Sequence, residues 1–146
     1  MKHDRTLRGL RQATALTLTG AALALAGCAT PEPETVSVAQ MVQRPAERAL
    51  VDGLRDYESG AFEAAERDFR KAIADTLRDP RDVAVAHKHL AFISCAFNRL
   101  ADCEDHFRQA FAADPAFHLT DAEIGHPVWG PVYRRVAAAV AGAHPR

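Results

Sequence analysis

The sequence has no hydrophobic stretch long enough to cross a bilayer as a helix. Its longest uncharged apolar run, residues 13–27, contains 15 residues, which corresponds to roughly 22 Å of α-helix against about 30 Å of hydrocarbon. The run follows a basic segment with Lys2, Arg5, Arg8 and Arg11. A basic head before a short apolar run is typical of a secretory signal peptide, so we expect a cleaved leader over residues 1–27.

The sequence also lacks the common arrangements of catalytic residues. It contains no glycine-rich phosphate-binding loop, no nucleophile placed near a candidate base and no isolated pair of acids. Acidic and basic residues alternate between positions 63 and 71, a spacing that favours i,i+4 pairs on a solvated helix face. We therefore expect no enzymatic activity and no small-molecule substrate.

Histidine and cysteine do not show the spacing of a metal site. The sequence has no CxxC or HxxxH motif, and His87 and His89 would face different sides of a helix. Cys103 and His106 would share a helix face with Cys95 nearby, but they form only part of a ligand set. We expect surface histidines and no bound metal.

Positive charge is scarce once the leader is set aside. Residues 28–146 contain 14 basic and 18 acidic side chains, and this net charge of −4 argues against a nucleic-acid-binding protein. The remaining 119 residues suffice for one small domain. Because alanine is abundant and β-branched runs are few, we expect an all-α fold.

The end of the apolar run carries a distinctive tetrapeptide, Leu25-Ala26-Gly27-Cys28. It resembles the lipobox of bacterial lipoproteins. The resemblance implies that the signal is cut before Cys28, whose thiol and new amino group receive acyl chains such as palmitate. Three acyl chains would anchor the protein firmly, since stable anchoring takes more than one chain. Ala29 rather than Asp follows the cysteine, which by the same resemblance implies the outer membrane. The lipid on Cys28 is the one non-protein group that we expect.

Composition divides the rest of the chain into two parts. Residues 28–45 carry three prolines and no helical stripe of apolar residues, so we expect a lipidated N-terminus and a flexible tether. From residue 46 onward apolar residues recur with the period of a helix. We therefore expect a helical domain over residues 46–146.

The helical domain contains an internal repeat with a shift of 38 residues. The shift superposes Gly60 on Asn98, and both residue types suit a left-handed turn between antiparallel helices. Apolar stripes over residues 50–57 and 86–93 predict a helix before each turn. The helix after each turn contains five matched apolar positions, Phe62 with Leu100, Ala65 with Cys103, Phe69 with Phe107, Ala72 with Ala110 and Ile73 with Phe111. The sequence thus predicts four helices in two hairpins.

These positions resemble the tetratricopeptide (TPR) repeat, whose second helix places an aromatic residue four positions after a small one and ends at Asp-Pro. The segment CEDHFRQAFAADP, residues 103–115, follows this pattern, and Gly53 fits the glycine of the first helix. A period of 38 rather than 34 implies extra residues in the loop at 75–82. By the same resemblance, the first helices would line a groove for a partner peptide or helix, through Leu50, Leu54, Tyr57, Lys88 and Phe92.

The C-terminal segment is expected to cap the second hairpin. Thr120 and Glu123 fit a capping box, Pro131 suits a first helical turn, and the last helix should stop near Gly142. Trp129 in this segment has two interpretations. It packs beneath the C-terminal helix, or it anchors a partner, since tryptophan is common at interface hot spots.

Cys95 and Cys103 lie on either side of the turn at Asn98, within one to two helical turns of it. In an oxidising compartment a disulfide between them would staple the two helices together. The alternative is a pair of reduced, buried thiols.

The second half of the chain resembles a more specific family. Residues 84–136, with the lipobox in front, resemble the small TPR lipoproteins associated with bacterial type VI secretion, the TssQ-like family, and the tail DPAFHLTDAEIGHPVWGPV is the most specific element. The resemblance implies a periplasm-facing outer-membrane lipoprotein that scaffolds a secretion complex by binding other proteins. One alternative is a pilotin-like or outer-membrane assembly lipoprotein of another envelope machine. Another, of a different class, is a metal- or thiol-dependent periplasmic enzyme.

Overall fold

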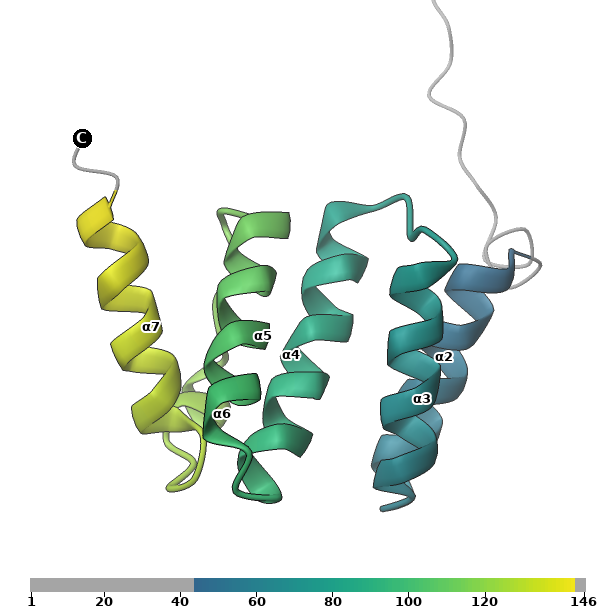
Figure 1. The fold of residues 1–146 in the computed structure, drawn as a ribbon, viewed down its shortest axis with the longest axis horizontal. Helices are drawn as coiled ribbons and strands as arrows, with labels where there is room; N and C mark the ends of the chain where they lie inside the picture. Colours follow the sequence, from purple (N-terminus) through teal and green to yellow (C-terminus); the bar gives the residue numbers. More distant parts are fainter. Residues whose placement is uncertain (1–43, 144–146) are drawn as a thin grey trace, which may run out of the picture. The chain divides into compact units, whose positions relative to one another are not determined.

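The computed structural model describes residues 44–143, and its regular structure is entirely helical (Figure 1). The helices are α2 (Pro45–Glu58), α3 (Phe62–Ala74), α4 (Pro80–Ala96), α5 (Leu100–Ala113), the single turn α6 (Asp121–Ile124) and α7 (Gly130–Ala143). No strand occurs between residues 44 and 143, so the prediction of an all-α fold is confirmed. The expected leader, the lipobox with Cys28 and nearly all of the tether lie outside the described residues.

The helices pack in chain order. α2 lies along α3 and α4 lies along α5, while α3 also packs on α4, so the two helical pairs stand next to each other (Figure 1). α7 packs against α5 beyond the second pair. The turns inside the pairs fall at Gly60, with a φ of 81°, and at Asn98, with a φ of 58°. Both turns use the left-handed backbone conformation that glycine and asparagine tolerate best.

Residues matched by the 38-residue shift occupy equivalent places in the core. Phe69 of α3 and Phe107 of α5 are both fully buried, and so are the small residues around them, Ala65 with Cys103 and Ala72 with Ala110. The pair Phe62 and Leu100, expected on the inward side of its helices, is instead exposed. Phe62 and Leu100 are 36% and 49% exposed, because each begins its helix just after the turn, where the partner helix has already ended.

Helix α4 contributes to two hydrophobic clusters. Leu90 and Ile93 belong to a first cluster built around Phe69. Phe92 and Cys95 belong to a second cluster, which contains Phe107. Since these residues lie on different sides of one helix, α4 buries two faces at once.

The loop between the two pairs is shorter than the sequence predicts. Extra residues were expected over 75–82, but α4 already begins at Pro80. The Asp79 carboxylate caps the helix by accepting a 2.9 Å hydrogen bond from the N–H of Arg81, and proline fits the first helical position because no N–H is needed there. Leu77, within the loop, is buried in the first cluster.

The C-terminal segment reaches α5 through a capped turn. The Thr120 hydroxyl accepts a hydrogen bond from the N–H of Glu123, and the Glu123 carboxylate accepts one of 2.8 Å from the N–H of Thr120, so the capping box is present. Pro131 lies in the first turn of α7, which continues to Ala143, one residue past the expected stop at Gly142. The inner side of α7 then buries Val132, Tyr133 and Val136 in the second cluster.

Gly53 provides a test of the packing between α2 and α3. A Cβ atom at this position would lie 2.9 Å from Cδ1 and Cε1 of Phe69, whose ring is fully buried and cannot move aside. At Gly142 of α7 an added Cβ meets nothing within 4 Å, so Gly142→Ala is the matched control, with a gain in helix propensity of the same sign.

We expect the free energy of unfolding of Gly53→Ala to lie about 1–3 kcal/mol below that of Gly142→Ala, because overpacking strains the core. Urea denaturation measures the difference. Equal stability of the two variants would contradict the close approach of α2 to the Phe69 ring.

Candidate functional site

The residues expected to line a groove are largely covered by the chain's own contacts. Leu50 is 6% exposed and belongs to the first cluster, while Phe92 is 3% exposed and belongs to the second. Leu54 and Tyr57 are half-buried and pack against the first cluster. Leu50 and Phe92 therefore offer no surface to a partner, whereas Leu54 and Tyr57 remain partly exposed.

Lys88, the fifth of these residues, is bound by the C-terminal segment. Its ammonium group donates a 2.7 Å hydrogen bond to Oε1 of Glu123 and lies 5.7 Å from the centroid of the Phe92 ring. Burial disfavours the ionised form of Glu123, but the hydrogen bonds from Lys88 and Thr120 outweigh it and hold the pKa of this carboxyl below its usual value. The pair therefore ties α4 to α6.

Trp129 is half-buried and used within the chain. Its ring stacks on Phe92 with the centroids 4.3 Å apart and on His126 with the centroids 3.3 Å apart. Its indole N–H donates a 3.0 Å hydrogen bond to the carbonyl of Glu123. Through these contacts Trp129 packs the C-terminal segment against the second cluster.

Cys95 and Cys103 are joined by a disulfide, with their Cα atoms 5.2 Å apart. Both residues are buried, and the crosslink connects the end of α4 to the start of α5. The turn at Asn98 lies between them. The disulfide therefore closes the end of the second helical pair.

His87, His89 and His106, expected at the surface, are each half-buried. His89 packs between the two helical pairs, stacked on Phe69 with a centroid distance of 5.1 Å and edge-on to Tyr57 at 4.9 Å. Its Nδ1 lies 2.8 Å from the carbonyl of Val85. Burial lowers the pKa of His89 to about 4. These histidines are partly buried because α4 lies between α3 and α5 and packs on both.

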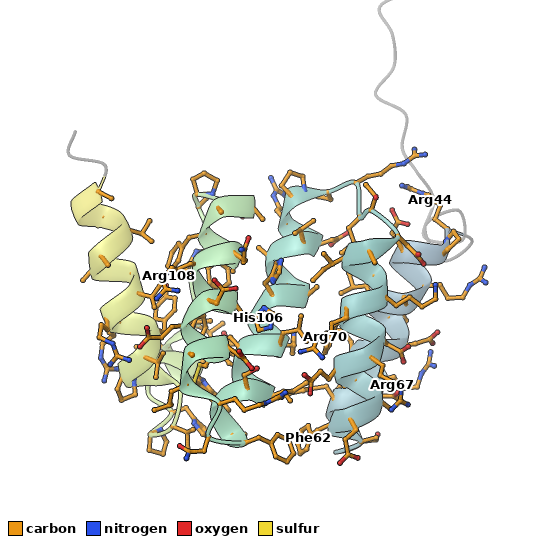
Figure 2. The ribbon with its side chains drawn as sticks, in the orientation of Figure 1. Arg44, Phe62, Arg67, Arg70, His106 and Arg108 are labelled. Carbon is orange, nitrogen blue, oxygen red and sulfur yellow. A yellow bond between two sulfur atoms is a disulfide. The ribbon has the colours of Figure 1, made fainter. Side chains whose placement is uncertain are left out.

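His87 and His106 form a pair between α4 and α5. Their Nδ1 atoms are 3.1 Å apart, so one ring donates an N–H and the other accepts it. Burial and the neighbouring His106 ring lower the pKa of His87 to about 4. Burial and the guanidinium of Arg70 lower the pKa of His106. Figure 2 shows the side chains of Arg70 and His106 at about the same height of the fold.

The structure contains an apolar groove that the sequence did not predict. It lies between α5 and α7, has a volume of about 650 Å³ and is lined by Phe111, Ala112, Pro115, Ala137, Val140 and Ala141. No lining residue is ionisable, so the groove offers contact area and no acid–base group. The spacing of three and four between residues 137, 140 and 141 is the sequence signal that could have indicated it.

Residues 44–143 contain neither a cluster of metal-ligating side chains nor a membrane-spanning helix. No three or more histidine, cysteine, aspartate or glutamate side chains in this part of the chain are grouped so as to hold a metal ion. No helix in the same part is long and apolar enough to cross a membrane.

No protein-family model, curated protein or solved structure matches this chain.

The buried histidines predict a loss of stability in acid. The pKa of His89 is about 4 in the folded chain and 6.5 for an unperturbed side chain, so the unfolded state takes up its proton first as the pH falls. Neutral His89 therefore makes its full contribution to the free energy of unfolding above pH 6.5. This contribution is lost progressively as the pH falls from 6.5 to about 4. We expect His89→Gln to reduce the pH dependence of the free energy of unfolding in this window.

His118→Gln is the control, because His118 is exposed and its Nδ1 lies 3.0 Å from the backbone carbonyl oxygen of Ala116, two residues away. Urea denaturation at several pH values measures both variants. If the free energy of unfolding of His89→Gln depended on pH as strongly as that of the wild type, the neutral, half-buried state of His89 would be contradicted. Part of the pH dependence should persist in this variant, because His87 remains.

The disulfide predicts a dependence of stability on redox conditions. Replacing both cysteines, Cys95→Ala with Cys103→Ala, should lower the free energy of unfolding by about 2–4 kcal/mol, because the crosslink restricts the unfolded chain. A reducing agent should destabilise the wild-type protein and leave the double variant unchanged. Equal stability of oxidised and reduced wild-type protein would contradict a stabilising crosslink.

Proposed function

We propose that the protein is a TPR-like lipoprotein of the bacterial outer membrane. In this proposal acyl chains on Cys28 anchor it, residues 28–45 tether it, and its helical domain faces the periplasm. There it serves as an interaction scaffold of a type VI secretion system, with no catalytic reaction of its own. The resemblance of residues 84–136 to the TssQ-like family supports the choice of machine.

The observation that carries the proposal is the equivalence of the two helical pairs. The 38-residue shift places one left-handed turn on another, Gly60 on Asn98, and one buried aromatic residue on another, Phe69 on Phe107. Stacked repeats of this kind produce extended surfaces for binding proteins. Such a surface is what a scaffold requires.

The polar groups of the described residues also favour binding over chemistry. The histidines that approach each other, His87 and His106, are half-buried and hydrogen-bonded together. The ion pair of Lys88 with Glu123 holds the C-terminal segment in place. These groups have structural partners, whereas the groove between α5 and α7 is apolar.

Two features support export to the periplasm. The short apolar run with its basic head and the tetrapeptide ending at Cys28 have the form of a lipoprotein signal. The disulfide between Cys95 and Cys103 is a crosslink of oxidising compartments, and the periplasm is one of these.

Acylation and capture of partners test the proposal in the native host. The full-length protein should incorporate labelled palmitate and fractionate with the outer membrane, and Cys28→Ser should do neither, because it lacks the acceptor thiol. Affinity capture from detergent-solubilised membranes should recover components of the secretion system with the wild-type protein and far less of them with Cys28→Ser.

The control for folding is the Cys95–Cys103 disulfide, which should form in both proteins if both are exported. An acylated protein that recovers components of a different envelope machine would overturn the assignment to type VI secretion. A wild-type protein that remains unacylated would overturn the proposal as a whole.

A further inference from the structure

A cluster of exposed apolar side chains lies at the turn end of the two helical pairs. Phe62 is 36% exposed, Phe97 is 53% exposed and Leu100 is 49% exposed. The rings of Phe62 and Phe97 meet edge-on with their centroids 6.2 Å apart, although they belong to different helical pairs. We call these three residues the tip patch. Figure 2 shows Phe62 at this end of the fold.

The position of the tip patch does not follow from the packing of the core. All three residues lie at or beside the turns at Gly60 and Asn98, where no other helix of residues 44–143 covers them. A single exposed apolar residue is ordinary, but neighbouring ones rimmed by polar residues mark an interaction site. Here the shared ring contact makes one surface from two helical pairs.

The rim of the tip patch is acidic. Glu58 ends α2, Glu63 follows Phe62 and Asp102 lies in the first turn of α5. All three are exposed. No ion pair holds any of these three carboxylates within residues 44–143.

Two basic residues lie near the tip patch and keep their charge. Arg99 donates hydrogen bonds of 2.9 and 2.8 Å to the two carboxylate oxygens of Glu66, and its guanidinium lies 6.0 Å from the centroid of the Phe97 ring. The Arg67 guanidinium donates to the backbone carbonyl of Glu63 at 3.2 Å. Against these two positive charges stand four carboxylates, those of Glu58, Glu63, Glu66 and Asp102, so the charge around the patch is negative on balance.

The tip patch lies at the far end of α2 from the point where the chain enters the domain. Helix α2 begins at Pro45 and ends at Glu58, a length of about 20 Å. If residues 28–45 tether the domain to a lipid anchor, the chain enters the domain at the end that is opposite to the patch. Anionic head groups would also be repelled by the acidic rim, so a protein is the better occupant than a bilayer.

We propose that the tip patch binds an amphipathic segment of a partner protein whose apolar side chains are flanked by lysine or arginine. Apolar side chains of the segment cover Phe62, Phe97 and Leu100, and this burial supplies the affinity. Its basic residues pair with Glu58, Glu63 and Asp102, which gives orientation and selects against acidic partners. This proposal depends on the proposed function in one respect: it takes the partner to be a protein of the cell envelope.

Site-specific photocrosslinking of the full-length protein in its native host tests this proposal. A photoreactive phenylalanine analogue is placed at position 97 or 100, and at position 51 as the matched control, since Val51 is 39% exposed on α2 away from the turns. Crosslinked peptides are identified by mass spectrometry. We expect adducts from positions 97 and 100, and not from 51, to map to segments with apolar residues at helical spacing and neighbouring basic residues.

The acidic rim is tested in the same cells. Neutralising it with Glu58→Gln, Glu63→Gln and Asp102→Asn should lower the adduct yield from position 97 by roughly tenfold, as expected when three exposed charge pairs are lost. Asp121→Asn, which removes an exposed carboxylate in α6, is the control and should leave the yield unchanged.

Four results would overturn the proposal: adducts with phospholipid, adducts with a second copy of this chain, adducts with segments that lack basic residues, or equal yields from positions 51 and 97. Basic amphipathic adducts on an envelope protein outside type VI secretion would support the tip patch and refute the proposed machine. The two proposals can therefore fail separately.

Discussion

Helix α4 has to bury two faces at once, and the packing of the other helices follows from this requirement. Leu90 and Ile93 need the cover of α2 and α3, while Phe92 and Cys95 need the cover of α5 and the C-terminal segment. A helix with a single apolar stripe would be satisfied by one partner. Because α4 is apolar on both sides, neither helical pair can be removed without exposing the core of the other.

The outer side of α5, away from α4, also needs to be covered by another helix. α5 leaves Phe107 and Phe111 uncovered on the side away from α4, and α7 covers them with Tyr133 and Val136. The single turn of α6 then brings Glu123 to Lys88 and holds Trp129 against Phe92. Arrays of helical repeats usually need such a terminal element, because each repeat buries its apolar face only against a neighbour.

Local constraints made the turns, the capping box and the buried aromatic residues predictable from the sequence. A positive φ favours glycine or asparagine, and a period of 3.6 marks the inward side of a helix wherever it occurs. The burial of His89 was not predictable, because it depends on which distant helices flank α4. For the same reason the period alone overstated the burial of Phe62 and Leu100, which lie beyond the end of the partner helix. The spacing of residues 137, 140 and 141 marks an apolar side of α7, but which part of it stays open as a groove depends on how far α5 covers it.

The disulfide has a consequence for the rigidity of the end of the second helical pair. Cys95 and Cys103 bracket the segment that carries Phe97, and Leu100 lies inside the same short loop. The two hydrogen bonds from Arg99 to Glu66 and the backbone hydrogen bonds of the turn already hold this segment. The crosslink adds a covalent restraint to them and removes conformations from the chain around Phe97 and Leu100. The redox state of the surroundings therefore sets how firmly these two apolar side chains are held.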